Sequence, residues 1–149
     1  MQPVIWECFI LDFKDTRDYL TEILEWKQVK KTKVKCLVDT GASQSIIFEH
    51  LVRDLEKIEL GFTYVQEVCD KPAKFRVVLL GVAILVDNEP IVSIHRVLIP
   101  VEKEVEEKLL QALKSHGAEA ILGRLSLDDL SIGIEPKTNK PIKLPILII

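Results

Sequence analysis

The chain has 149 residues and a formal net charge of −3, with 48% of its residues hydrophobic and 29% charged. This length suits one domain that buries its own core, so we expect a single domain over residues 1–149. The acidic balance argues against a nucleic-acid partner, because proteins that neutralise phosphates need a surplus of Lys and Arg.

The first strand is expected at residues 4–11, whose sequence VIWECFIL is rich in β-forming residues. The next segment, residues 15–26, leaves two interpretations open. Asp15 or Thr16 could cap a short helix there, or the sequence TEILEW could form a strand. Residues 33–38 (KVKCLV) alternate between polar and apolar and then become fully apolar, which is typical of a strand that enters a core.

A short helix is expected near residues 48–57, where apolar residues recur on one face, and Gly61 is placed to end it. The sequences GFTYVQEV and FRVVLLGVAILV then predict two strands that could pair as a hairpin, with a break at CDKPA between them. The turn sequence DNEP at 87–90 sends the chain back antiparallel through IVSIHRVLI. Gly81, inside the second strand, indicates a bulge or a bend.

The clearest helix is expected at residues 101–116. Its valines and leucines recur at helical spacing, acidic residues crowd its start, and Lys114, His116 and Gly117 mark its end. Shorter elements follow: a strand at AILG, a turn or helix at LSLDDL, a strand at SIGIEP and a terminal strand at IKLPILII. Many short strands with few helices predict a mostly-β domain of the barrel or sandwich type.

The three cysteines, Cys8, Cys36 and Cys69, are widely spaced and form no Cys-x-x-Cys or Cys/His cluster. We therefore expect neither a zinc site nor a disulfide framework, and we expect a reducing, cytoplasmic location. No apolar run approaches the roughly 20 residues that span a bilayer, so no membrane partner is expected.

Two segments pass from an apolar strand directly to residues that can carry chemistry. In LVDTGAS, Asp39 ends the strand, and Thr40 and Gly41 follow in a turn that can hold the carboxylate in place. In AILGR, the strand ends at Gly123, where another strand can pack closely, and Arg124 follows. Because an isolated carboxylate on an apolar strand is costly to bury, Asp39 is the candidate functional residue.

These two motifs, in this order, resemble those of the retropepsin-like (retroviral-type) aspartic proteases, of which the chain would be a cellular, non-viral member. The resemblance implies a mostly-β fold, a closed acid-protease barrel with a short helix after the active-site loop. The amphipathic helix at 101–116 lies where the viral enzymes have a short connection, so it would be an insertion.

The resemblance assigns a role to each residue of the first motif. Asp39 corresponds to the catalytic carboxylate, and Thr40 to the hydroxyl that ties the two active-site loops together. Gly41 corresponds to the backbone position that contacts substrate and orients Asp39. Ala42 and Ser43 would line the floor of the cleft and bind substrate.

The second motif would provide structural support. Ile121 and Leu122 precede Gly123, which would underlie the loop that bears Asp39. Arg124 resembles an arginine that braces the dimer or the turn.

The sequence also departs from the family. Many viral members carry an acid where Ser43 stands, and that acid pairs with the arginine matching Arg124. Arg124 therefore needs another partner, for which Glu49 and Asp54 are candidates. The flap, a hairpin that closes over substrate, corresponds to residues 61–75 and lacks the usual glycine-rich tip.

Aspartic proteolysis needs two carboxylates that share one proton, one to activate water and one to protonate the scissile carbonyl oxygen. The sequence holds Asp39 and no second Asp-Thr-Gly or Asp-Ser-Gly. Since retropepsin-like enzymes are homodimers, the resemblance implies that a second copy supplies the other carboxylate across a two-fold axis. We therefore expect a homodimeric aspartic endopeptidase that acts on a peptide or protein substrate without a metal or other cofactor.

Two other functional classes stay open. A dimer of this fold with weak or no activity could bind peptides or proteins in its cleft, or the dimer could be purely structural. A serine hydrolase is not expected, because nothing places Ser43 or Ser45 beside a histidine and His95 reads as a core or edge residue. The apolar C-terminal sequence PILII could pair within the barrel or across the dimer.

Overall fold

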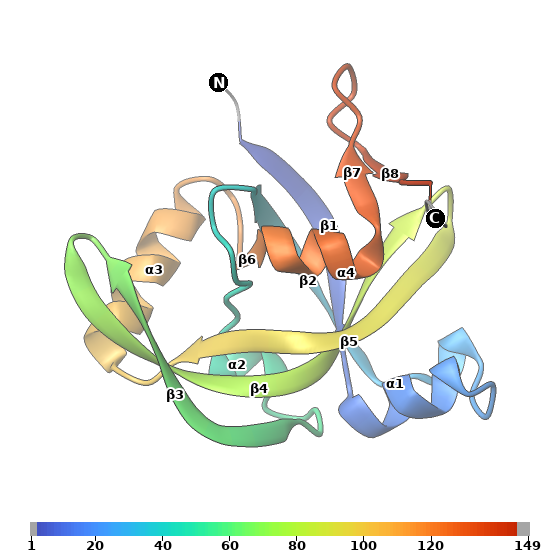
Figure 1. Cartoon of the computed structure of the whole chain (residues 1–149), viewed down its shortest axis with the longest axis horizontal. Helices are drawn as coiled ribbons and strands as arrows, with labels where there is room; N and C mark the ends of the chain where they lie inside the picture. The colour runs from blue at the N-terminus through green and yellow to red at the C-terminus, as the bar shows by residue number, and fades with distance from the viewer. Residues whose placement is uncertain (1–2, 146–149) are drawn as a thin grey trace.

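The computed structural model describes residues 3–145, and strands make up most of their regular structure (Figure 1), which confirms the mostly-β prediction. The helices described are α1 (Phe13–Leu20), α2 (Glu49–Val52), α3 (Lys103–Lys114) and α4 (Arg124–Leu130), with a 3₁₀ turn η1 (Trp26–Gln28). The strands are β1 (Val4–Leu11), β2 (Lys31–Asp39), β3 (Ile58–Val68), β4 (Lys71–Val86), β5 (Glu89–Pro100), β6 (Ala120–Gly123), β7 (Ile132–Ile134) and β8 (Pro141–Lys143).

The main sheet has six strands, five of which follow the order β3-β4-β1-β2-β6. Strands β3 and β1 pair with successive parts of one edge of β4, and the sixth strand, β5, pairs with the other edge. The 16-residue strand β4 organises it, because it pairs with β5 from Phe75 to Val86 on one edge. On its other edge it pairs with β3 as far as Leu79 and then with β1 from Gly81. All these ladders are antiparallel except that of β2 with β6, which is parallel. Strands β7 and β8 form a separate hairpin.

The closed barrel implied by the family resemblance is not formed. Among residues 3–145, no strand ladder joins β6 to β5 or to β3. After Asp39 the chain leaves the sheet as a loop that passes between β5 and β6. The loop pairs with these strands through isolated bridges and not through a strand ladder. Ile46 forms one bridge to Leu98 of β5 and one to Ile121 of β6.

Apolar side chains fill two main clusters, one on each side of this bent sheet. The larger cluster holds residues from β1, β2, β4, β5 and β6 together with Leu127 and Leu130 of α4. The second lies under α3, whose Val105, Leu109 and Leu113 share it with apolar residues of β3, β4 and β5. The helix expected at 101–116 is therefore present and packed, although Val101 precedes it and is exposed. No helix in the described part of the chain is long and apolar enough to cross a membrane.

Glycines account for two local corrections. Gly61 does not end a helix, since α2 stops at Val52; it lies in β3 with a positive φ of 75°, where the β3–β4 register shifts. Gly81 causes no bulge, because its pairing with β1 and β5 is regular. A Cβ at Gly81 would lie 2.1 Å from Oγ1 of Thr16, so glycine makes room for α1.

The segment 15–26, which the sequence left open, contains most of α1, then a turn and the first residue of η1, with no strand. The expected hairpin is formed by β3 and β4. Its turn consists of Cys69 and Asp70, which is a shorter break than the expected CDKPA. The chain reverses at Asp87 and Asn88, as the sequence DNEP predicted. Within the described residues the expected terminal strand appears as β8, and residues 146–149 of PILII lie outside them.

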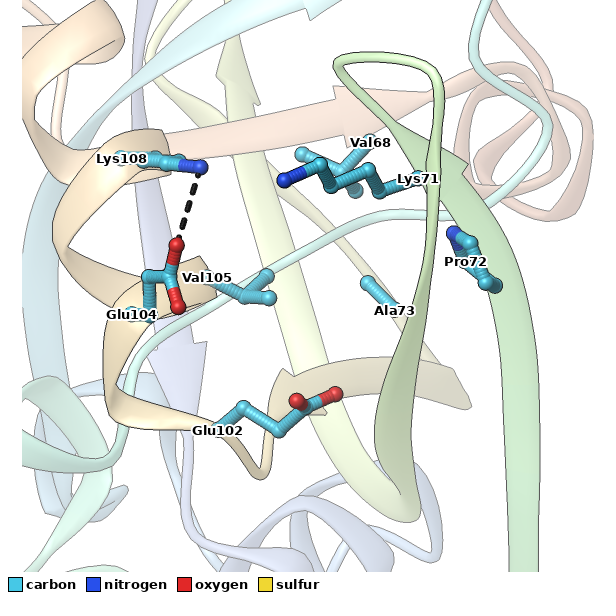
Figure 2. A pocket seen from close by; sticks show the side chains of 8 residues that line it. All are labelled: Val68, Lys71, Pro72, Ala73, Glu102, Glu104, Val105 and Lys108. Carbon is cyan, nitrogen blue, oxygen red and sulfur yellow. Dashed lines mark ion pairs between the residues drawn. The ribbon is translucent and has the colours of Figure 1, made fainter.

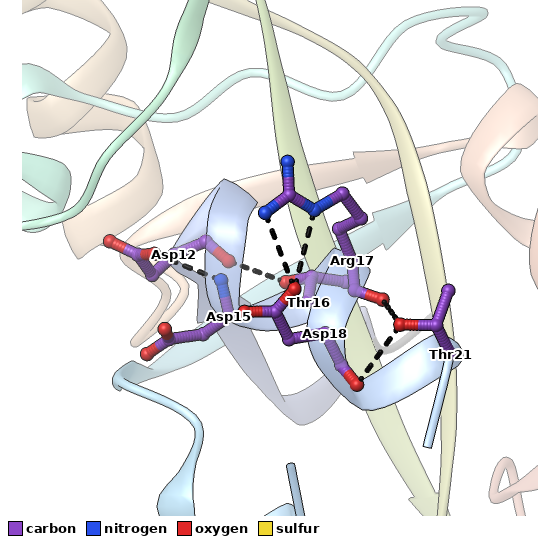
Figure 3. A network of polar contacts seen from close by, with 6 residues as sticks. All are labelled: Asp12, Asp15, Thr16, Arg17, Asp18 and Thr21. Carbon is purple, nitrogen blue, oxygen red and sulfur yellow. Dashed lines mark hydrogen bonds and ion pairs between the residues drawn. The ribbon is translucent and has the colours of Figure 1, made fainter. Parts of the chain in front are cut away.

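Helix α1 is capped by Asp12, one turn earlier than the sequence suggested (Figure 3). The buried Asp12 carboxylate accepts hydrogen bonds from the backbone N–H of Asp15 at 3.1 Å and of Glu56 at 2.7 Å. Its backbone carbonyl accepts from Oγ1 of Thr16 at 2.6 Å. One side chain thus joins the start of α1 to the chain that leads into β3.

We predict that Asp12→Ala lowers the free energy of unfolding by about 2 kcal/mol, because two backbone N–H groups lose their acceptor. Asp18→Ala is the matched control and should cost under about 0.5 kcal/mol, since among residues 3–145 the Asp18 carboxylate bonds the exposed side chain of Arg17 alone. Urea unfolding measures both. Equal losses in the two variants would contradict the role given to Asp12.

Candidate active site

Asp39 lies at the C-terminal end of β2, a strand with a neighbour on each side, β1 and β6. In the parallel ladder with β6, Asp39 is directly opposite Gly123. The two sequence motifs, far apart in the chain, therefore end side by side. Residues Ile121 and Leu122 form the part of β6 that pairs with Leu37 and Val38.

The loop after Asp39 is held by its own backbone. The N–H of Gly41 donates to Oδ1 of Asp39 at 3.0 Å, and the N–H of Ala42 donates to the Asp39 carbonyl at 3.1 Å. Oδ2 of Asp39 has no hydrogen-bond partner among residues 3–145. Asp39 is half-buried, whereas Thr40 and Gly41 are exposed, so this edge of the chain is open to a further molecule.

The second motif fixes the far end of the same loop. The N–H groups of Arg124 and Leu125, at the start of α4, donate to the carbonyls of Ala42 at 2.8 Å and of Ser43 at 3.0 Å. The first turn of α4 has free N–H groups, as every helix does, and here the loop carbonyls accept from them. Ala42 and Ser43 are thereby tied to the second motif through their backbone.

Gly123 is required by close packing, since its φ of −88° suits any residue. A Cβ at this position would lie 2.5 Å from the backbone carbon and oxygen of Gln44 and 3.0 Å from the carbonyl oxygen of Ala42. Backbone atoms at this distance cannot rotate away as a side chain would. The sequence-based expectation that Gly123 underlies the loop of Asp39 agrees with this geometry.

Ser45 is a site residue that the sequence analysis missed. Its buried Oγ accepts a hydrogen bond from the N–H of Gly123 at 2.9 Å and also bonds Oγ of Ser126 in α4. The only sequence signal was a small polar residue between the motif and the apolar run IIF. Ser45 thus links the loop, β6 and α4 at one point.

The partners suggested for Arg124 were wrong in one case and unsupported in the other. Glu49 instead pairs with Arg76 at 3.0 Å and with Lys57 at 3.7 Å, and these cations together lower the pKa of Glu49 even though burial opposes the shift. Asp54 is exposed and forms no ion pair with a described residue, and neither does Arg124. The exposed Arg124 therefore acts here through its backbone N–H.

The β3–β4 hairpin contains residues 61–75, where the flap was expected. Cys69 and Asp70 form its turn, both in the left-handed region with φ of 51° and 64°, which is typical of a two-residue hairpin turn. Figure 1 shows α3 beside this hairpin. A cavity of about 110 Å³ lies between them (Figure 2). Its lining comprises Val68, Lys71, Pro72, Ala73, Glu102, Glu104, Val105 and Lys108.

His95 is buried in β5, as expected, and is not part of a catalytic triad. Its Nδ1 bonds Oγ of Ser93 at 2.8 Å, and the carboxylate of Asp129 lies 3.9 Å from the same nitrogen, too far to hydrogen-bond. Its Nε2 is buried without a hydrogen-bond partner among the described residues. Burial lowers the pKa of His95 from 6.5 to about 4, so the ring is neutral near pH 7.

Among residues 3–145, no group of three or more His, Cys, Asp or Glu side chains is arranged to hold a metal ion. In comparisons with known proteins, the chain matches no protein-family model and no curated protein. The resemblance to retropepsin-like proteases therefore rests on the two motifs and on the way in which the chain brings them together.

We predict that Gly123→Ala lowers the free energy of unfolding by about 2–3 kcal/mol, because the new Cβ meets rigid backbone of Gln44. Gly133→Ala is the control: its Cβ would meet only the side chain of Leu144, at 2.9 Å, which can rotate, so the cost should stay under about 1 kcal/mol. Chemical denaturation of both variants tests this. A loss at Gly123 no larger than that at Gly133 would refute the close-packing explanation.

We predict that acid destabilises the protein through His95. Because the folded pKa lies below the unfolded one, the stability is fully present above pH 6.5 and falls as the pH drops toward 4, by up to about 3 kcal/mol. In urea unfolding at pH 7 and pH 4.5, His95→Gln should lose less stability between the two pH values than the wild type. His116→Gln, which removes an exposed histidine, should behave as the wild type does. An unchanged acid loss in His95→Gln would contradict the assignment.

Proposed function

We propose that this chain is a homodimeric aspartic endopeptidase in which Asp39 of each copy supplies one of two catalytic carboxylates. The observation that carries the proposal is the register of Asp39 opposite Gly123, with the loop between the motifs held at both ends by backbone hydrogen bonds. This arrangement presents a carboxylate in a fixed orientation at an open edge, which general acid–base catalysis requires.

The hydrogen bonding of Asp39 favours a role for each of its oxygens. Oδ1 is fixed by the N–H of Gly41, which leaves Oδ2 to share a proton with the second carboxylate or to hold a water molecule. In the proposed reaction, one carboxylate takes a proton from water as the water attacks the peptide carbonyl. The other donates its proton to the carbonyl oxygen, so this addition gives a tetrahedral diol and a pair that still holds one proton. The diol then collapses: one carboxylate takes a proton from a diol hydroxyl as the C–N bond breaks, and the protonated carboxyl gives its proton to the leaving nitrogen, so the pair again ends with one proton.

A dimer follows from this chemistry, because one carboxylate cannot be acid and base in the same step. A two-fold axis brings identical residues together, and the exposure of Thr40 and Gly41 is what a contact between two such loops would require. We also propose a reducing, cytoplasmic setting, since Cys8, Cys36 and Cys69 are all free.

A second candidate is a peptide-binding dimer without hydrolysis. It is favoured by one observation, the packing of α3 against the β3–β4 hairpin, which would restrain a flap that must open and close. In this case Asp39 would fix the loop rather than catalyse a reaction.

We predict that the wild-type chain cleaves members of a peptide library at some pH between 4 and 7.5 and that Asp39→Asn abolishes cleavage, because the amide can neither accept nor donate the catalytic proton. Mass spectrometry of the products measures cleavage, and sedimentation should give a dimer for both proteins. Asp54→Asn, an exposed carboxylate away from the motif, should cleave as the wild type does.

Circular dichroism at each pH distinguishes lost activity from acid unfolding. A folded wild-type protein that cleaves nothing across this range, or that sediments as a monomer at micromolar concentration, would sink the endopeptidase proposal. Peptide binding that persists without cleavage would favour the second candidate.

A further inference from the structure

Two neighbouring cavities beside the candidate site share two residues, Gln44 and Arg96. The larger, of about 170 Å³, is lined by Gln44, Phe62, Tyr64, Val77, Arg96 and Leu98. The smaller, of about 100 Å³, is lined by Gln44, Arg96, Leu125, Ser126 and Asp129. Gln44 and Arg96 thus stand between a mostly apolar space and one that contains a carboxylate.

The larger cavity lies on one face of the sheet. Arg96 and Leu98 are alternate residues of β5, and Leu98 is paired with Val77 of β4. Phe62 and Tyr64 are alternate residues of β3, which pairs with the other edge of β4. Side chains at alternate positions point to the same face, so three strands contribute to one wall.

This wall is joined to the candidate catalytic loop by backbone. The N–H of Leu98 donates to the carbonyl of Ser45 at 2.9 Å, and the N–H of Ile47 donates to the carbonyl of Leu98 at 2.9 Å. Gln44 therefore directly precedes the place where the loop is hydrogen-bonded to β5. Since it follows Asp39 by five residues, the two Cα atoms are at most about 18 Å apart, a distance that an extended peptide of similar length covers.

The charges in this region favour an anionic guest. Arg96 is exposed, and its guanidinium forms no hydrogen bond or ion pair with a described residue. No acidic residue lines the larger cavity, where Arg96 is the one charged residue of the lining. In the smaller cavity, burial and the charge of Asp128 raise the pKa of Asp129, while Arg96 partly opposes this shift.

We propose that Arg96 and Gln44 form a specificity subsite for an acidic side chain of the peptide substrate, which enters the larger cavity. The apolar wall would contact the methylene groups of a glutamate, the guanidinium would bind its carboxylate, and the Gln44 amide would donate a hydrogen bond. This subsite rests on the proposed function for its substrate, but its recognition of an acidic peptide does not require cleavage.

The test measures binding to Asp39→Asn, which keeps the cavity, using fluorescent peptide pools with glutamate or glutamine fixed at one position that is moved along the peptide. At one position, the glutamate pool should bind about fivefold more tightly than the glutamine pool. Adding Arg96→Met should remove this preference, and Arg96→Glu should reverse it in favour of the glutamine pool. Arg53→Met, at an exposed arginine outside both cavities, should leave it unchanged.

Each result decides between the two proposals. A glutamate preference that depends on Arg96, in a chain whose wild type cleaves nothing, keeps the subsite and removes the endopeptidase. Cleavage by the wild type with equal binding of both pools at every position removes the subsite alone. A preference that survives Arg96→Met, or the absence of any binding, also overturns the subsite.

Discussion

The parallel pairing of β2 with β6 is the contact on which the rest of the structure depends. It sets Asp39 opposite Gly123, and the missing Cβ of Gly123 lets the backbone of Gln44 pass against the end of β6. Only because the chain crosses there can Ile46 bridge to both β5 and β6. The same contact therefore positions the candidate catalytic carboxylate and links the two ends of an open sheet.

Strands were predictable from the sequence where burial alternates along the chain. Residues 4–11 form β1 over the same span, and residues 33–38 and 120–123 lie in strands whose apolar side chains alternate between the two main clusters. Val38 and Leu122 belong to one cluster, and Leu37 and Ile121 to the other. The glycines were less predictable. Gly81 is needed because Thr16 from α1 packs on it, and no local pattern encodes a neighbour so distant in sequence.

The candidate site was predictable as far as its motifs reach. The placement of Gly123 under the loop of Asp39 was implied by the family resemblance of the two motifs, and the pairing of β2 with β6 sets Gly123 opposite Asp39. The ion-pair partner of Glu49 was not predictable, because Arg76 lies beside Glu49 only through the long-range pairing of β4. Ser45 and Arg96 were missed for the same reason: each acts through residues brought close only when β5, β6 and α4 assemble.

Helix α3 limits how the β3–β4 hairpin can move. One apolar cluster contains Leu109 and Leu113 of the helix, Phe75 of the hairpin, and Ile46 and Ile121 beside the candidate site. Lifting the hairpin away from α3 would expose several of these side chains, at roughly 1.5–3 kcal/mol for each one fully exposed. Val68 and Ala73, which flank the turn, also pack in this cluster and line the cavity beside α3, so the helix restrains the hairpin up to its tip. A peptide that reaches Asp39 by lifting this hairpin must therefore separate it from α3 or move the two together.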